Sequence, residues 1–211
     1  MAQPDTIERI LDSAAALFAE RGYTETSLRT ITSTANVNLA AVNYHFGSKK
    51  ALIQAVFARY LTPFCSYLNS NLNEAEARQG APLDVDEAIE ILFSSLFQSA
   101  REVDSNPEQF MRLLGLAYTQ SQDHLRHFII KEYGETYARF MDILRLALPD
   151  VDPTVFFWRL YFMLGASVFT LSSYKPINNI SVADFDQDRS IEDVVSFLIP
   201  SITILLRGSA E

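Results

Sequence analysis

The sequence predicts an all-helical protein of about nine helices. Apolar residues recur at helical spacing along most of the chain, and no segment alternates as a half-buried strand would. Proline and asparagine stand where helices are expected to begin or end. With 211 residues, 48% of them hydrophobic, the chain can bury a substantial core. We expect an N-terminal head, residues 1–61, and a larger helical body, residues 62–211.

The first helix is expected to cover two short helices that follow it. It carries one apolar stripe at a 3.6-residue period, made by Ile7, Ile10, Leu11, Ala14 and Phe18. The two short helices should form a helix-turn-helix at about residues 27–46. Ser27 and Asn38 suit their N-caps, because short polar side chains accept hydrogen bonds from free backbone N–H groups. Asn36 suits the left-handed backbone of the turn between them.

The chemistry of this unit favours DNA. A helix-turn-helix presents its second helix to the major groove, where small side chains permit close approach and Asn43 can pair with an adenine edge. Tyr44, His45 and Lys49 suit phosphate contacts. The predicted DNA-binding residues are Thr26, Ser27, Asn38, Leu39, Ala40, Asn43, Tyr44, His45 and Lys49.

The segments AALFAERGY, TSLRTIT and ANVNLAAVNYHFGSKKAL carry a family resemblance. From Thr6 to about Leu61 the chain resembles the DNA-binding domain of TetR-family transcriptional regulators. Asn36 replaces the usual glycine of the turn, and Asn38 replaces the usual serine or threonine cap. Both replacements are physically tolerated. The resemblance implies a TetR-like fold and a cytoplasmic bacterial protein, associated with the nucleoid, that binds double-stranded operator DNA.

The net charge of −9 at first argues against a DNA partner. Residues 1–60, however, hold six basic and five acidic side chains, whereas residues 61–211 hold eleven basic and twenty-one acidic ones. The acidity therefore belongs to the body. The nearly neutral head should bind DNA non-specifically only with modest affinity, because few counterions are released.

A long helix of 20–28 residues should begin at Lys49 and end at the polar stretch Glu74–Pro82. Later helices are expected at about residues 85–102, 107–119, 123–148, 153–174 and 190–207. Lys175–Asp188, which contains a proline and paired asparagines, is the longest predicted loop.

The last two predicted helices are apolar on nearly every side, so one small body cannot easily cover both. We therefore expect a homodimer, in agreement with the family resemblance, which implies a four-helix interface between subunits. A twofold dimer presents two reading heads to a palindrome. The predicted interface residues are Leu160, Leu164, Val168, Val195, Leu198, Ile199 and Ile202.

The resemblance also implies that the body senses a small molecule. The segments FMRLLGLAYTQSQDHLRHFI and FWRLYFMLGAS are similar to those of fatty-acid-responsive members of the family, which implies a long-chain fatty acid or its acyl-CoA as effector. The predicted effector-binding residues are Phe110, Met111, Arg112, Leu114, Tyr118, Trp158, Phe162 and Phe169. The candidate cations for an acidic head group are Arg112, His124, Arg126 and Arg159.

Other functions were weighed against this one. His124 and His127 beside Asp123 do not reach a metal-ligand pattern, and no phosphate loop or nucleophile motif is present, so we expect no metal, no cofactor and no enzyme. Val155–Leu171 is apolar but contains Arg159, which favours a buried helix over a membrane span. Cys65 is alone, and the N-terminus has no secretory leader pattern. An amphipathic drug or antibiotic, with efflux genes as targets, remains the alternative effector.

Overall fold

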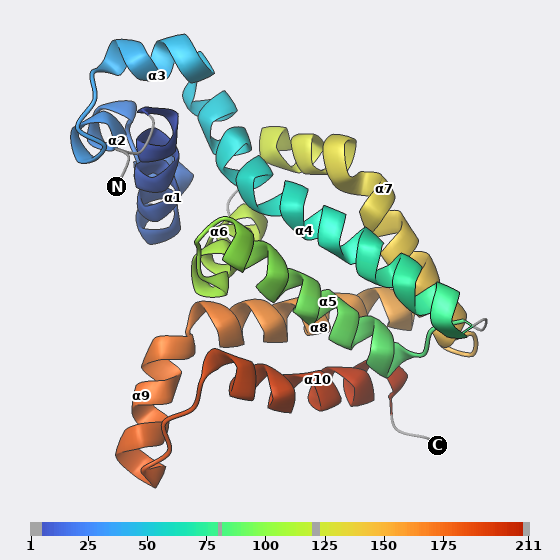
Figure 1. Cartoon of the computed structure of the whole chain (residues 1–211). Helices are drawn as coiled ribbons and strands as arrows, with labels where there is room; N and C mark the ends of the chain where they lie inside the picture. Colours follow the sequence, from blue (N-terminus) through green and yellow to red (C-terminus); the bar gives the residue numbers. More distant parts are fainter. Residues whose placement is uncertain (1–5, 80–81, 120–122, 209–211) are drawn as a thin grey trace.

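The computed structural model describes residues 6–79, 82–119 and 123–208, which form ten helices joined by short segments (Figure 1). The helices are α1 (Thr6–Glu25), α2 (Leu28–Thr34), α3 (Leu39–Phe46), α4 (Lys49–Gln79), α5 (Val85–Glu102), α6 (Pro107–Thr119), α7 (Asp123–Ala147), α8 (Pro153–Ser172), α9 (Tyr174–Phe185) and α10 (Ile191–Arg207). The predicted all-helical class is confirmed, with one helix more than expected.

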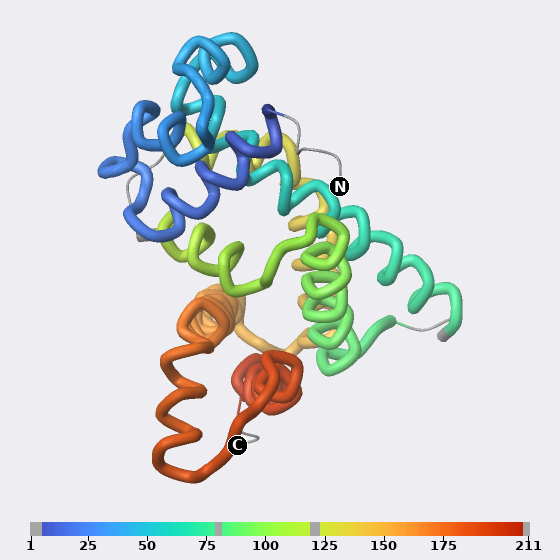
Figure 2. Tube along the Cα trace, turned by 60° about the vertical axis from the view of Figure 1, so that its left-hand side comes forward, coloured from blue at the N-terminus to red at the C-terminus, as the bar shows by residue number. Residues whose placement is uncertain are grey.

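The helices are arranged as a small head and a layered body. In Figure 1 α1, α2 and α3 lie at one end, and α4 leads from them along the body. Helices α5, α6 and α7 pack around α4 and α1, while α8 and α10 lie side by side at the far side of the body. Figure 2 shows α8 and α10 nearly end-on, with α9 projecting beyond them.

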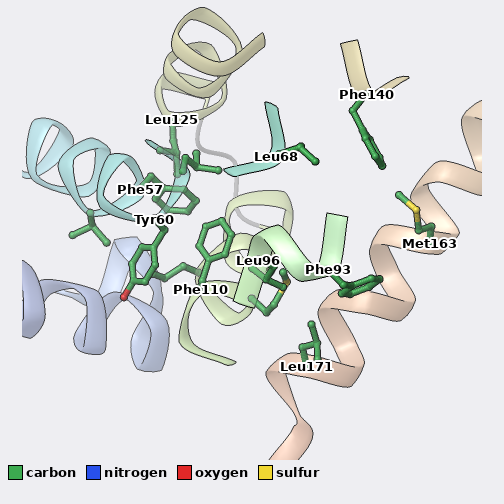
Figure 3. Packing of buried hydrophobic residues seen from close by; sticks show 14 of the residues in the cluster. Phe57, Tyr60, Leu68, Phe93, Leu96, Phe110, Leu125, Phe140, Met163 and Leu171 are labelled. Atoms are coloured by element: carbon green, nitrogen blue, oxygen red, sulfur yellow. The ribbon is translucent and has the colours of Figure 1, made fainter. Parts of the chain in front are cut away.

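One continuous apolar core runs from the head into the body. Phe18, Ile31 and Val42 are its centre in the head, each at most 1% exposed. Tyr60 of α4 stacks on Phe110 of α6, with ring centroids 5.2 Å apart (Figure 3). Fully burying an apolar side chain of this size stabilises the fold by roughly 1.5–3 kcal/mol. The shared core therefore stabilises the contact between head and body.

Helix α4 is 31 residues long, longer than expected. The predicted polar break at Glu74–Pro82 is wrong in its first part, because the helix continues to Gln79. Strong helix formers fill this stretch, Ala75 is fully buried, and Arg139 of α7 pairs with Glu76 at 2.9 Å. At ~1.5 Å per residue the helix spans roughly 46 Å, which makes it the mechanical link from head to body.

The predicted loop Lys175–Asp188 is also wrong over most of its length, since α9 occupies Tyr174–Phe185. Pro176 stands in the first turn of α9, where its missing N–H costs no helical hydrogen bond. The paired asparagines are helical, and the side chain of Asn178 bonds to the segment after the helix. Asp186 ends α9 in the left-handed conformation, with φ 53°.

Helix α8 is long and apolar enough, by length and composition only, to cross a membrane. Within the fold it packs against α6 and α10, and Phe156, Met163 and Leu171 are buried there. Its opposite face is exposed, so the protomer covers only part of this helix, as the sequence predicted.

Candidate nucleic-acid interface and body surfaces

Three polar residues set the geometry of α2 and α3. Ser27 Oγ accepts a hydrogen bond from the Thr30 N–H at 3.0 Å, and Asn38 Oδ1 accepts one from the Ala41 N–H at 2.8 Å. Between the helices Asn36 has φ 51°, a left-handed conformation that asparagine tolerates. All three predicted roles are confirmed, and the turn forms without a glycine.

The outer face of α3 is exposed, whereas Val42 anchors its inner face in the core. Tyr44 is 85% exposed, and its ring lies edge-on to that of His45 at 5.0 Å. An aromatic side chain held so far out of the core is available to a partner. The predicted DNA contacts on this exposed face are Leu39, Ala40, Asn43, Tyr44 and His45.

Lys49 lies where α4 begins, beside the end of α1. Its Nζ donates to the Thr24 carbonyl at 3.3 Å and lies 4.3 Å from the centroid of the Tyr23 ring. Burial lowers the pKa of Lys49, and the nearby Glu25 opposes that change. These contacts hold the ammonium group near the start of α4, where Lys50 is also exposed.

The predicted contact of the Thr26 side chain with DNA is wrong. Thr26 is fully buried, and its hydroxyl donates to the carbonyls of Gly22 at 2.7 Å and Leu17 at 3.2 Å. Gly22 has φ 79° and interrupts the helical backbone of α1. Thr26 therefore pins the corner between α1 and α2. The sequence placed it beside the cap but could not show that the chain folds over it.

Contacts between α1, α4 and α6 join the head to the body. Arg59 of α4 forms ion pairs with Asp12 and, at 3.4 Å, with Glu8 of α1. Tyr60 Oη donates to Gln109 Oε1 of α6 at 3.2 Å. Because α6 also packs on α1, a movement of α6 would directly change the position of the head.

His124 makes a second contact between body and head. Its ring lies 5.2 Å from that of Tyr23 in α1, and its buried Nε2 has no hydrogen-bond partner in the described part of the chain. Burial and the nearby Lys50 lower the pKa of His124, opposed by Asp123. The neutral imidazole is therefore the form that suits this junction.

We expect this junction to weaken in mild acid. A histidine whose pKa is lower in the folded than in the unfolded state stabilises the fold above its unfolded pKa, and this contribution is lost as pH falls through the folded pKa. The melting temperature should therefore fall between pH 7.5 and 5.5 more steeply in the native protein than in a His124→Gln variant. Calorimetry across this range measures the difference, with His127→Gln as control. Parallel profiles for the native protein and His124→Gln would contradict the expectation.

The predicted effector stripes of α6 and α8 do not line one cavity. Phe110 and Met111 are buried in the core, whereas Trp158, Phe162 and Phe169 are 54–66% exposed on the outer face of α8. The helices are already close between these stripes, because a Cβ on Gly115 would lie 3.0 Å from Val168 Cγ1. The two stripes therefore do not converge within the protomer, and the α8 part of the effector assignment stays a prediction. Of the predicted α6 residues, Leu114 packs against the core and Tyr118 is exposed.

Three of the four candidate cations have other partners. Arg112 donates to Glu108 at 2.6 Å and to the Ser172 carbonyl at 3.0 Å. Arg159 donates to two carbonyls at the end of α10, at 2.9 and 3.0 Å, and His124 lies at the head. Within the described residues Arg126 forms no ion pair and is exposed.

Arg126 instead interacts electrostatically with Tyr118, which belongs to a group of tyrosines. Tyr118 of α6 and Tyr161 of α8 have ring centroids 6.4 Å apart. Tyr118 is exposed as a whole, but partial desolvation of its phenol, followed by Tyr161 and Tyr137, raises the pKa of Tyr118, and the guanidinium of Arg126 opposes this rise. Three phenols and the guanidinium of Arg126, from α6, α7 and α8, thus form one electrostatic group. The sequence spacing alone gave no sign of this grouping.

The predicted dimer-interface residues mostly face the body of their own chain. Val195 and Ile202 are only 4% and 1% exposed. Four of the others pack half-buried against the core, namely Leu160, Val168, Leu198 and Ile199, and Leu164 is half-buried. Val195 and Ile202 are thus covered by their own chain, and the interface role of the other five residues stays a prediction. Arg159 fixes the rotation of α8 by reaching the end of α10, which turns the other stripe outward. The outward stripe comprises Trp158, Phe162 and Phe169 of α8 with Phe197 and Ile204 of α10.

The two histidines of α7 do not converge on one site. His127 Nδ1 lies 2.7 Å from the Asp123 carbonyl, while His124 packs on Tyr23. In the described ranges no group of three His, Cys, Asp or Glu side chains is placed to hold a metal ion. Burial raises the pKa of the Cys65 thiol to about 11, so its reactive thiolate is scarce at neutral pH.

Both the N-terminal and the C-terminal part of the chain match known protein families. Residues 10–56 match the family described as bacterial regulatory proteins, tetR family, and residues 90–203 match the tetracyclin repressor-like C-terminal domain. The chain is 28% identical over 137 residues to the negative transcriptional regulator IcaR of the biofilm operon of Staphylococcus aureus, covering 62% of this chain and 68% of IcaR.

Solved structures share the fold, among them the two that follow. The fatty acid degradation regulator FadR of Bacillus halodurans superposes with a TM-score of 0.60 at 18% identity, covering 99% of this chain and 98% of FadR. AmtR of Mycobacterium smegmatis superposes with a TM-score of 0.61 at 16% identity, covering 100% of this chain and 89% of AmtR.

Proposed function

Because the chain belongs to the TetR family of bacterial regulatory proteins, we propose that it is a repressor that binds a palindromic operator as a dimer. Residues 1–61 are the DNA-binding head, and residues 62–211 are the effector and dimerisation body. The observation that carries this proposal is the exposed outer face of α3, held rigid by its cap and by the left-handed turn before it. Asn43 and Ala40 read base edges, and Tyr44 and His45 contact phosphates.

The dimer forms through the outward stripe of α8 and α10. This stripe places five large apolar side chains, each 54–67% exposed, on two adjacent helices. A contiguous apolar patch of this kind marks an interaction surface. Dimerisation also compensates for the small positive charge of each head, because two heads joined rigidly bind one palindrome with a gain in avidity.

The effector is a long-chain fatty acid or its acyl-CoA. The support is the resemblance of residues 110–129 and 157–167 to the fatty-acid-responsive family member PsrA, together with the aromatic character of the body. The name of the B. halodurans relative points the same way. The acidic group of the ligand binds Arg126 beside Tyr118, Tyr137 and Tyr161, because a cation and phenolic donors suit a carboxylate or phosphate.

Ligand binding is transmitted through α6. An acyl chain that enters between α6 and its neighbours must displace packed side chains, and α6 contacts both α1 and the Tyr60 region of α4. The ligand can shift the equilibrium between binding and released states only by its difference in affinity for them. DNA release therefore requires the body to bind effector more tightly when the heads are out of register.

The test is selection of duplexes from a random library, followed by titration of the bound operator with oleate or oleoyl-CoA. We expect a palindrome to be recovered and released by one of these ligands. Arg126→Ala should need about tenfold or more ligand, because a charge-assisted hydrogen bond contributes about 1.5–3 kcal/mol. Lys131→Ala, an exposed cation on the same helix, is the matched control.

The outcomes separate the parts of the proposal. Failure to recover any palindrome would remove the repressor assignment. If the recovered operator is released by an amphipathic drug and by neither lipid, the fatty-acid effector is wrong. The result would instead favour a regulator of efflux genes. Equal responses of Arg126→Ala and Lys131→Ala would move the head-group site elsewhere.

A further inference from the structure

Helix α9 and the segment after it project from the body. We call residues 174–190 the arm; it extends past α8 and α10 on the outward side of these helices (Figures 1 and 2). No residue of α9 is buried. Its large apolar side chains are nevertheless numerous and 39–71% exposed: Ile177, Ile180, Val182 and Phe185.

Polar contacts hold the arm in one conformation. Asn178 Nδ2 donates to Asp188 at 2.7 Å, and Asn178 Oδ1 accepts from the Arg189 N–H at 3.1 Å. The Tyr174 hydroxyl donates to the Arg189 carbonyl. At the base of the arm, Lys175 Nζ lies 3.4 Å from the buried carboxylate of Glu108 in α6. The arm is therefore a preorganised element whose apolar side chains lack cover in the protomer.

The arm encloses a hollow of about 310 Å³ together with α8 and α10. Thr170, Tyr174, Ile177, Phe185 and Phe197 are among its lining residues. Phe197 also belongs to the outward stripe of α8 and α10, so the hollow is continuous with the proposed dimer interface. The available space suits one large aromatic side chain, which a partner on that interface can supply.

The charge of the arm disfavours two other classes of partner. Residues 174–190 carry three acidic and two basic side chains, and Glu192 and Asp193 follow at the start of α10. This net negative charge does not attract DNA or anionic lipid surfaces. An apolar protein surface remains, and the continuity with α8 and α10 identifies a second copy of this chain as its source.

Twofold symmetry indicates which residue of the second copy meets the hollow. A twofold axis that lies in the α8–α10 face and runs perpendicular to α8 reverses the direction of α8 in the other subunit. Gly165 permits close approach of two such helices, because it has no side chain and the space beside it is open, with nothing within 4 Å of an added Cβ. With the axis near Gly165, Trp158 of one subunit comes opposite Thr170 and Tyr174 of the other. Trp158 is 54% exposed in the protomer.

We propose that the arm clasps a second copy of the chain and that its hollow receives the Trp158 side chain of that copy. This inference rests on the proposed dimer and extends it, since each subunit then completes a site on the other. The exposed ring of Trp158 and the exposed side chains of the arm are covered in a single step. The clasp is also tied through Lys175 and Glu108 to α6, the helix that contacts the head.

Trp158 is the only tryptophan of the chain, so its fluorescence reports on this contact directly. The experiment compares the full-length protein with an Ile177→Ser, Phe185→Ser double variant by tryptophan emission, acrylamide quenching and sedimentation equilibrium. In the native dimer we expect a short-wavelength emission and weak quenching. In the double variant, measured at concentrations that keep it dimeric, emission should move to longer wavelength and quenching should increase, and the dimer Kd should rise about tenfold or more.

Ile130→Ser is the matched control, because Ile130 of α7 is 60% exposed and lies outside the arm; it should leave all three measurements unchanged.

As a second probe, benzoylphenylalanine is placed at position 185 in mixed dimers of unlabelled and ¹⁵N-labelled chains. It should cross-link one chain to a peptide of the other chain that contains Trp158. Suppose that the native protein is a dimer, but the double variant has the same fluorescence and the same dimer Kd, or all cross-links stay within one chain. Either result would overturn the proposed clasp by the arm and leave the dimer standing. A native protein that is monomeric at every concentration would overturn the dimer and the arm together.

Discussion

Replacing Gly165 by arginine is expected to convert the protein into a monomer and to weaken operator binding by about 100-fold or more, the loss that accompanies separation of two linked binding sites. Gly165 lies in the middle of the outward stripe of α8, between Phe162 and Phe169, and a new side chain there meets no atom of its own protomer within 4 Å. Arginine would instead enter the interface, where an unpaired buried charge is costly.

Sedimentation equilibrium and operator titration measure these two effects, and the thermal unfolding of the monomer checks its integrity. Gly134→Arg is the matched control, since a Cβ at this glycine of α7 meets only the flexible Ile130 side chain at 3.8 Å. It should leave the dimer and operator affinity unchanged. A Gly165→Arg protein that stays dimeric with native affinity would show that the subunits associate through another surface.

The head could be predicted in detail because local chemistry determines its structure. Ser27, Asn36 and Asn38 are each required by a cap or a left-handed turn, and the structure confirms all three. The failure at Thr26 has a different origin. Its burial depends on α1 folding back beside Gly22, and sequence neighbours do not encode that contact.

The body could be predicted as a set of helices but not as a set of oriented faces. Helix α8 is apolar on nearly all sides, so its periodicity does not decide which stripe faces inward. The decision depends on the long-range hydrogen bonds of Arg159 to the end of α10, 47 and 48 residues away in sequence. Periodicity alone therefore did not predict that Trp158, Phe162 and Phe169 face outward, although the conclusion that the protomer leaves α8 partly uncovered was correct.

Helix α9 illustrates a second limit. Proline and paired asparagines favour loops on average, yet Pro176 falls in a first turn and Asn178 bonds across to residues 188 and 189. Its helical state therefore depends on tertiary contacts and on position within the turn. The arm, which we propose to complete the dimer, is therefore the part of the body whose secondary structure was predicted least well from residue propensities.

Asn43→Ala is expected to produce the largest loss of sequence-specific binding in the head. A bidentate asparagine–adenine contact contributes about 1–3 kcal/mol of discrimination, and a symmetric dimer loses it twice. The operator Kd should rise about 30-fold to 10⁴-fold, while the melting temperature stays constant because the Asn43 side chain is exposed. Asn73→Ala, which changes an exposed asparagine of α4 outside the head and the arm, serves as the control and should retain native operator affinity.

The salt dependence of binding then separates base reading from charge. Asn43 is neutral and releases no counterion, so the slope of log K against log salt should be the same in Asn43→Ala as in the native protein. Lys50→Ala removes an exposed cation at the start of α4 and should lower that slope by about one unit per contacted phosphate. Loss of affinity in Asn43→Ala that is equal for operator and random duplex would contradict base reading and assign α3 a backbone-contacting role. Loss confined to the operator, with the slope unchanged, is the result that the exposed, capped and core-anchored geometry of α3 predicts.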